Sequence, residues 1–457
     1  MLKWRHKHMK RIYLDYAAST PVSRKVGAEL NKLLAVNSAC FGNPSSTHFE
    51  GSLARDLLEE SRLNIARNLQ VHIDEVVFTS GATEANNLVI QGVYDASLSK
   101  IHPIREGFLN MPKNLIPKED DVLTKNSNLF SDGVKNPHII TSSIDHSAIL
   151  EPIRALQKKG CKVSFVNPNA KKIIPVEEIG GLLTKETILI SLSLVNSELG
   201  TIASVRDIAR AIAIFKKKNN RSFNDYPYLH MDASQATSLI KVNPNFFGAD
   251  FVTFDGAKMY APKGIGALVA LRERKFNPIL FGGGQEKGIR PGTPNVIFAY
   301  ALGVALSECY KTQEKEFKRL EKLQKYFEEN LKRTFPNCRI NGGEEKRLPS
   351  FVNVCIPGLD AEYSIVQLDL LGVAASSASA CQSIPAPDRA LRAGGRAGAG
   401  GAGFSYIVQE LPNGKECSSS SIRFSLGRTT KKGDLDQALQ ALLKVVTLQK
   451  VSFHRER

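Results

Sequence analysis

The sequence predicts an α/β fold in which helices flank a mostly parallel β-sheet. Short apolar runs of strand length alternate with amphipathic stretches of helical length over much of the chain, and this alternation is typical of such folds. The length of 457 residues exceeds one compact core, and with 42% hydrophobic residues we expect two domains. No run of about 18 apolar residues occurs, so we predict no membrane span and no membrane partner.

The individual elements follow from hydrophobic periodicity and from the turn residues between them. A short strand in 12–20 enters a turn, helical spacing follows in 25–37, and residues 41–51 form a loop. The turn at 81–87 opens a helix. We expect further strands at 75–80, 138–143, 162–167, 187–196, 228–234, 251–254 and 265–270, and further helices at 52–70, 147–160, 204–218 and 315–333.

Two stretches interrupt this regular pattern. Residues from about 100 to 136 are polar and carry no sustained period, which indicates an inserted surface loop. The run RAGGRAGAGGAG at 392–403 is typical of a flexible Gly/Ala linker, which we place at about 384–416. At the start of the chain, Met9 is a second candidate initiator.

The composition restricts the classes of partner. Lysines and arginines produce a net charge of +16 but are spread along the chain without interleaved aromatic residues, so we predict no direct nucleic-acid binding. An acidic protein partner or an anionic small ligand remains open. The seven cysteines form no CxxC pair, and their odd number favours reduced thiols in a cytoplasmic protein over a disulfide framework or a zinc site.

One turn carries the strongest chemical signal. Lys258 lies in a Gly- and Pro-rich turn between the two apolar runs at 251–254 and 265–270. Desolvation in such a turn lowers the pKa of a lysine and suits it to Schiff-base chemistry, although a solvated surface lysine is the ordinary alternative.

Three other strand ends carry polar residues. In TSGATEANN, the N–H groups of Ala82 and Thr83 and the Thr83 hydroxyl can hold a phosphate at a helix start, or they form an ordinary cap. Asp232 ends an apolar strand, where a carboxylate can keep a pyridinium nitrogen protonated, and Gln235 follows it. His146 also follows a strand and can stack on a ring or shuttle protons, though a structural role is common for a lone histidine.

Taken in order, these segments resemble the pyridoxal-phosphate-dependent cysteine desulfurases of the class V aminotransferase type. The resemblance runs from about residue 13 to residue 430 and is specific because ten motifs occur in register. The matching motifs are YLDYAAST, FGNPSSTH, FTSGATEANN, IDHSAI, VNSELG, HMDASQA, the Lys258 turn, FGGGQEKGIRPGT, SSASAC and SSIRFSLGR.

The resemblance implies a type I fold of pyridoxal-phosphate enzymes. Its large domain has a seven-stranded, mostly parallel sheet, and its smaller domain is of the α+β type. On this basis we place the large domain at 22–275 and the small domain at 276–457, with residues 1–21 joining the small domain. The family further implies a homodimer with shared active sites.

The resemblance also implies roles in binding pyridoxal phosphate. Lys258 would form the Schiff base and later move the Cα proton, Asp232 would pair with the ring nitrogen, and Gln235 would contact the ring oxygen. The phosphate would be held by Ala82 and Thr83, and by Thr293 of a neighbouring subunit.

Substrate and sulfur chemistry are implied in the same way. Arg423 would bind the substrate carboxylate with its planar fork, and Asn43 would lie beside that carboxylate. His146 would stack on the cofactor ring and help to deprotonate the substrate thiol. Cys381 would be the nucleophile, on an exposed stretch of small residues that resembles the long catalytic loop of one subgroup.

The chain departs from the family pattern at three cofactor contacts. Asp255 and Ala257 stand in the turn that usually reads Ser-Gly-His-Lys, so two phosphate donors are missing. A carboxylate near the phosphate is expected to lower affinity unless Asp255 turns away. Ser197 replaces a second Asn that usually contacts the cofactor's ring oxygen, and its hydroxyl is shorter.

The function that this resemblance implies is cysteine desulfuration. L-cysteine would be converted to L-alanine, and the sulfur would remain as a persulfide on Cys381 for an acceptor, such as an iron–sulfur scaffold or a tRNA-thiolation protein. Two alternatives stay open at this point. One is selenocysteine lyase or a related lyase of the same fold, and the other is a scaffold subunit that no longer binds the cofactor.

Overall fold

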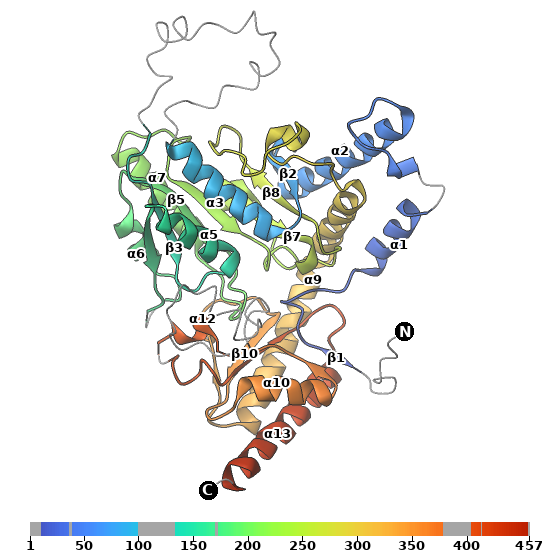
Figure 1. Ribbon diagram of the computed structural model, residues 1–457. Helices are drawn as coiled ribbons and strands as arrows, with labels where there is room; N and C mark the ends of the chain where they lie inside the picture. The colour runs from blue at the N-terminus through green and yellow to red at the C-terminus, as the bar shows by residue number, and fades with distance from the viewer. Residues whose placement is uncertain are drawn as a thin grey trace, which may run out of the picture.

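The structure of the protein is a computed structural model that describes residues 11–35, 39–98, 133–169, 172–377, 404–412 and 414–455 (Figure 1). Most of the expected insertion at about 100–136 and the expected nucleophile Cys381 lie outside the described residues. Within the described part of the chain, no helix is both long enough and apolar enough to cross a membrane.

A seven-stranded sheet forms the centre of the large domain and confirms the α/β prediction. Its strand order is β2-β8-β7-β6-β5-β3-β4, and all neighbours are parallel except those of β8, which runs antiparallel to both β2 and β7. The bounds are β2 Val76–Thr79, β3 His138–Ser142, β4 Lys162–Val166, β5 Thr187–Ser193, β6 Tyr228–Asp232, β7 Phe251–Asp255 and β8 Gly266–Ala270.

Helices cover both faces of this sheet because adjacent strand residues point to opposite sides. Val77 and Ile139 pack in the core under α3 and α5, whereas their neighbours Phe78 and Ile140 belong to the larger core shared with α2 and α7. Each such fully buried side chain contributes about 1.5–3 kcal/mol. The helices of this domain are α1 Arg24–Leu33, α2 Phe49–Leu69, α3 Ala82–Leu98, α5 Ser147–Lys158, α6 Val176–Leu182, α7 Val205–Lys218 and α8 Pro244–Phe247.

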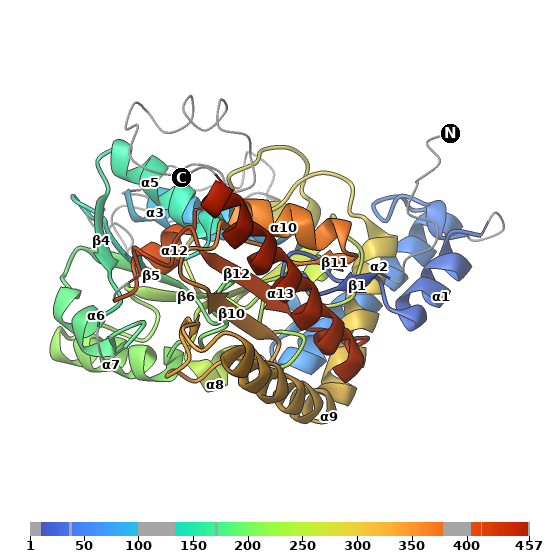
Figure 2. The same ribbon diagram turned by 90° about the horizontal axis from the view of Figure 1, so that it is seen from below.

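A three-stranded antiparallel sheet organises the small domain. Its order is β12-β10-β9, and α10 and α13 pack against each other over it (Figure 2). The small domain contains β9 Arg339–Ile340, β10 Phe351–Cys355, α10 Ala361–Leu370, β11 Val373–Ala374, α12 Tyr406–Gln409, β12 Ser421–Ser425 and α13 Lys432–Arg455.

Two elements connect the domains. The strand β1 (Ile12–Tyr13) pairs in parallel with β11 of the small domain. The helix α9 (Val296–Thr334) packs against α1 and α2 of the large domain and against β10 and α13 of the small domain. Figure 1 shows α9 running from one domain into the other.

The described residues correct two expectations about the C-terminal third. The linker was expected to reach about residue 416, but residues 406–409 form α12, in which Ile407 and Val408 are fully buried. The expectation of reduced thiols throughout is wrong for Cys355 and Cys417, which form a disulfide with Cα atoms 5.4 Å apart. Cys355 pairs with Ser421 in the ladder of β10 and β12, and this brings the turn before β12 next to it.

Candidate active site

The carboxyl ends of three parallel strands create the edge at which ligands of open α/β sheets bind. The N–H of Leu194, just after β5, donates to the carbonyl of Asp232 at the end of β6 at 2.8 Å. The N–H of Ser193 donates to Asp145 Oδ1, just after β3, at 2.8 Å. The predicted residues that follow β3, β5 and β6 therefore lie along one edge of the sheet.

Asp232 is a buried carboxylate held by neutral donors. Asn86 Nδ2, on α3, donates to its Oδ2 at 2.7 Å, and the N–H of Ser234 donates to its Oδ1 at 2.9 Å. Only 7% of Asp232 is exposed, and no lysine or arginine among the described residues forms an ion pair with it. A buried carboxylate without a counter-charge is costly, so this position favours a cationic ligand atom.

A chain of hydrogen bonds orients Asn86. Thr253 Oγ1 donates to Asn86 Oδ1 at 2.5 Å, and Thr253 in turn lies 3.4 Å from His230 Nε2. Since the only hydroxyl proton of Thr253 goes to Asn86, His230 donates from Nε2 and accepts at Nδ1 from Ser191 at 2.8 Å. Burial lowers the pKa of His230 to about 4, against the opposing charge of Asp232, so the imidazole is neutral.

The Lys258 turn joins β7 to β8, as predicted, through a short 3₁₀ helix, η4 (Gly256–Lys258). The Lys258 Nζ donates to the carbonyls of Ala17 at 2.8 Å and Ala18 at 2.5 Å. Thr20 donates to the Ala257 carbonyl from both its N–H at 2.8 Å and its hydroxyl at 3.0 Å. The segment after β1 therefore fixes both the turn and the amine.

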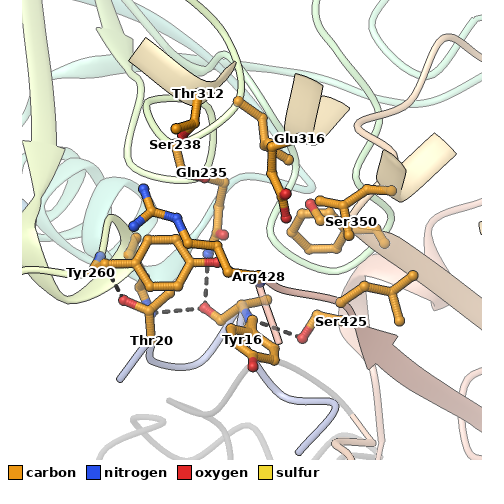
Figure 3. A pocket seen from close by; sticks show the side chains of 16 residues that line it. Tyr16, Thr20, Gln235, Ser238, Tyr260, Thr312, Glu316, Ser350, Ser425 and Arg428 are labelled. Atoms are coloured by element: carbon orange, nitrogen blue, oxygen red, sulfur yellow. Dashed lines mark hydrogen bonds between the residues drawn. The ribbon is translucent and has the colours of Figure 1, made fainter. Parts of the chain in front are cut away.

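Gln235 reaches the same carbonyl as the lysine. Its Nε2 donates to the Ala17 oxygen at 3.0 Å. Figure 3 shows Gln235 beside Thr20, Tyr260 and Arg428 around a small cavity between the domains. The cavity volume is about 20 Å³, which admits about one water molecule and is too small for a cofactor ring.

The amino end of α3 is not open to an anion in the way that the sequence suggests. The N–H of Ala82 donates to Asp255 Oδ2 at 3.1 Å, and the N–H of Ala257 donates to Asp255 Oδ1 at 2.7 Å. The neighbouring Thr83 is exposed. Asp255 thus turns toward the expected phosphate position, because the free N–H groups and the dipole of a helix start attract a carboxylate.

Arg423 is fully buried in β12, with 1% of its surface exposed. Its guanidinium donates to Asp15 Oδ1 at 2.8 Å and to the carbonyl of Ser197 at 2.9 Å. Its Nε is buried without a hydrogen-bond partner among the described residues. Ser197 therefore contributes its carbonyl oxygen to the arginine, a role that the sequence did not suggest.

His146 caps the helix that follows β3. Its Nδ1 accepts from the N–H of Ala148 at 3.1 Å, which places the proton of the neutral imidazole on Nε2. The preceding Asp145 is buried and accepts from Ser193 and Ser142 N–H groups and from the Thr141 hydroxyl. Burial nevertheless raises the pKa of Asp145 to about 6.

The structure does not bring three predicted residues to this edge. Asn43 lies in an exposed turn, where its Oδ1 accepts from the N–H of Ser45 at 3.0 Å, and the amino end of α2 beside it is at the outside of the molecule (Figure 1). Thus Asn43 does not lie beside Arg423 within one chain. Thr293 is also exposed, as a contact to a neighbouring subunit requires, and Cys381 is outside the described residues.

Sequence reasoning missed residues that the structure makes central. Asn86 lies one turn after Ala82, and this helical spacing was a usable signal within the quoted motif. Asp15, Ala17 and Ala18 belong to the quoted YLDYAAST segment. Their contacts to Arg423 and Lys258 bridge more than 200 residues, and no local pattern reports such contacts.

Comparisons with known proteins place these features in context. A family model described as aminotransferase class-V matches residues 12–104 and 124–438. The chain is 31% identical over 439 residues to a protein named "Cysteine desulfurase IscS" from Dictyoglomus turgidum, and the match covers 96% of this chain and 95% of that protein.

Solved structures are similar over nearly the whole chain. A "NIFS-LIKE PROTEIN" has a TM-score of 0.75 at 24% identity, and the match covers 96% of this chain and 100% of that one. A structure titled "SspA in complex with cysteine" has a TM-score of 0.66 at 25% identity, and the match covers 91% of this chain and 99% of that one. These likenesses support the fold that the sheet order shows.

Proposed function

The chain belongs to the class V aminotransferase family, and from this premise we propose that it is a cysteine desulfurase. The reaction converts L-cysteine to L-alanine and leaves the sulfur on Cys381. The proposal is carried by the buried Asp232 carboxylate, which has no cationic partner among the described residues. It lies at the same sheet edge as the Lys258 turn, in a chain that resembles named cysteine desulfurases.

The residues at this edge fit the ring of pyridoxal phosphate. A protonated ring nitrogen would supply the counter-charge that Asp232 lacks. The hydroxyls of Ser143 and Ser234, which follow β3 and β6, are buried without a hydrogen-bond partner among the described residues. When bound, the cofactor supplies an electron sink for negative charge at the substrate Cα. At the phosphate end, Asp255 occupies the amino end of α3.

Lys258 is the proton carrier at Cα in this proposal. The carbonyls of Ala17 and Ala18 hold its Nζ in one position and accept two of its protons. A neutral amine is required to take a proton, so the contacts to these carbonyls must loosen before Lys258 acts as a base. The segment after β1 therefore positions the amine between turnovers.

Arg423 binds the substrate carboxylate. Asp15 and the Ser197 carbonyl engage its two terminal nitrogens and fix the plane of the guanidinium. The buried Nε has no partner among the described residues, and each terminal nitrogen keeps a second N–H, so donors remain for a ligand. A planar guanidinium held on one side by the protein is preorganised for a carboxylate on the other.

The sulfur transfer is a displacement that balances without an added oxidant. The Cys381 thiolate attacks the substrate sulfur, an S–S bond forms, and the substrate C–S bond breaks with its electron pair left on carbon. Protonation of that carbon yields alanine. His146 assists by taking the substrate thiol proton at Nδ1, which becomes available when its bond to the Ala148 N–H opens.

A homodimer and a sulfur acceptor complete the proposal. Leu280 and Phe281 are 47% and 88% exposed on the segment that leads to Thr293. Such exposed apolar residues support an interface between two copies of the chain. The acceptor is a protein of the iron–sulfur scaffold or tRNA-thiolation type.

The test is an absorbance spectrum of the purified protein, followed by incubation with pyridoxal phosphate and then with L-cysteine and a reductant. We expect a visible band that shifts with L-cysteine, together with release of alanine and sulfide. Lys258→Ala should lose the band and the products, whereas Cys381→Ala should keep the band and lose sulfide. A protein that stays colourless with pyridoxal phosphate would refute the proposal.

A further inference from the structure

Asp255 ends β7, and its carboxylate lies against the turn between β2 and α3. Both of its oxygens accept backbone N–H groups, from Ala82 at 3.1 Å and from Ala257 at 2.7 Å. A Cβ atom on Gly81 would lie only 2.9 Å from Asp255 Oδ2. The turn thus approaches the carboxylate closely because residue 81 is a glycine.

The Asp255 carboxylate is held by backbone groups, without a lysine or arginine ion pair in the part of the chain that the structure describes. Its charge is therefore balanced by backbone N–H groups and by the dipole of the 17-residue helix α3. The acidic residue in the first turn of α3 differs in this respect. Glu84 accepts from the Ser80 N–H at 2.7 Å but also pairs with Arg290 at 2.8 Å, and Arg290 holds its pKa below the ordinary value against the effect of burial.

A helix start offers few N–H groups, and each can serve one anion at a time. The Ala82 N–H that the sequence assigns to a phosphate already donates to Asp255. A dianionic phosphate must either displace this carboxylate or bind beside an unpaired negative charge. Two negative charges this close repel each other, and the repulsion lowers the affinity for the phosphate.

We propose that the Asp255 carboxylate competes with the cofactor's phosphate for the N–H groups at the start of α3. It thereby determines how strongly the site prefers a pyridoxal ring with a 5′-phosphate over one without it. This inference rests on the proposed function. In the wild-type protein the phosphate adds little affinity, so pyridoxal 5′-phosphate and unphosphorylated pyridoxal bind with similar strength. The ring contacts at Asp232 and Lys258 supply most of the affinity for either compound.

The experiment is a titration of the full-length protein with each of the two compounds, followed by the visible absorbance that depends on Lys258. The variants are Asp255→Asn, which keeps the shape and removes the charge, and Asp255→Ser. Both should lower the Kd for pyridoxal 5′-phosphate by at least about tenfold and change the Kd for pyridoxal by less than about twofold. Asp207→Asn is the control for loss of one negative charge, because Asp207 is exposed and paired with Arg210.

The result that overturns the inference is an equal change for both compounds, or no change, in Asp255→Asn. The wild-type protein alone also tests it if a variant fails to fold. A wild-type preference of about a thousandfold or more for the phosphorylated compound would contradict the inference, and a preference below about tenfold would support it. The absence of a Lys258-dependent band with either compound, in every variant, would instead refute the proposed function itself.

Discussion

Replacing Arg423 by lysine tests the assignment of the substrate carboxylate. Lysine retains the positive charge but presents a point charge in place of a planar fork, so it cannot hold Asp15, the Ser197 carbonyl and a substrate carboxylate together. We therefore expect Arg423→Lys to weaken the binding of L-cysteine while the protein still takes up its cofactor.

The magnitude follows from the bonds that the guanidinium makes. It donates to Asp15 at 2.8 Å and to Ser197 at 2.9 Å in a fully buried position, and a hydrogen bond from a charged group contributes about 1.5–3 kcal/mol. If lysine stays with Asp15, the bond to the substrate is the one that is lost. The KM for L-cysteine should then rise by roughly 10- to 150-fold.

The assay is release of alanine and sulfide at varied L-cysteine concentration, with the visible band as a check on cofactor content. Arg319→Lys is a matched control, since Arg319 also binds a carboxylate, that of Glu316, and a carbonyl, that of Gly427. A KM within about threefold of wild type in Arg423→Lys would refute the carboxylate assignment. A loss of the band in that variant would show that the arginine serves the cofactor instead.

Three further predictions concern buried groups. Asn86→Ala removes one of the two donors to the buried Asp232 carboxylate and leaves its Oδ2 without that bond, so the protein should lose about 1–3 kcal/mol of stability and bind the cofactor more weakly; unchanged denaturant midpoints would contradict this. Burial raises the pKa of Asp145 from 3.8 to about 6, so its stabilising contribution is complete below pH 3.8 and is lost as pH rises through 6. The free energy of unfolding of wild type, relative to that of Asp145→Asn, should therefore fall by up to about 3 kcal/mol between pH 4 and pH 7 in urea titrations. A difference that does not change with pH would refute the shift. Reduction of the Cys355–Cys417 disulfide should lower the free energy of unfolding by about 2–4 kcal/mol, measured as a lower unfolding midpoint with reductant. If a Cys355→Ser/Cys417→Ser double variant remains sensitive to reductant, the disulfide is not the cause.

Local sequence patterns predict most of the strands and helices of the large domain. The apolar runs around Lys258 form β7 and β8 as expected, because two buried strands and a tight turn have a clear signature in sequence. Asp232 could be placed at a strand end for the same reason. The long helix α9 was only partly recognised, since its first half is buried and lacks the charged face of its second half.

Contacts between distant residues could not be predicted in the same way. Nothing near Cys355 indicates a partner 62 residues later, because disulfide pairing depends on the register of β10 and β12. The direction of Asp255 was left open by the sequence and depends on the approach of the α3 turn to β7. Pairing of Asp15 with Arg423 likewise joins residues 408 positions apart in the chain.

The path of the first strand has a consequence for synthesis on the ribosome. Ile12 emerges early, but its partner Val373 follows only after about 360 further residues. At about 5–20 residues per second this delay is roughly 20–70 s. During that time the large-domain sheet can form, and Thr20 and Gln235 can hold the segment after β1 near Lys258, but the pairing of Ile12 with Val373 and the bond from the Ala17 N–H to Ser425 are still missing. A nascent chain that stalls before β11 therefore carries a folded sheet with an unfinished lysine site.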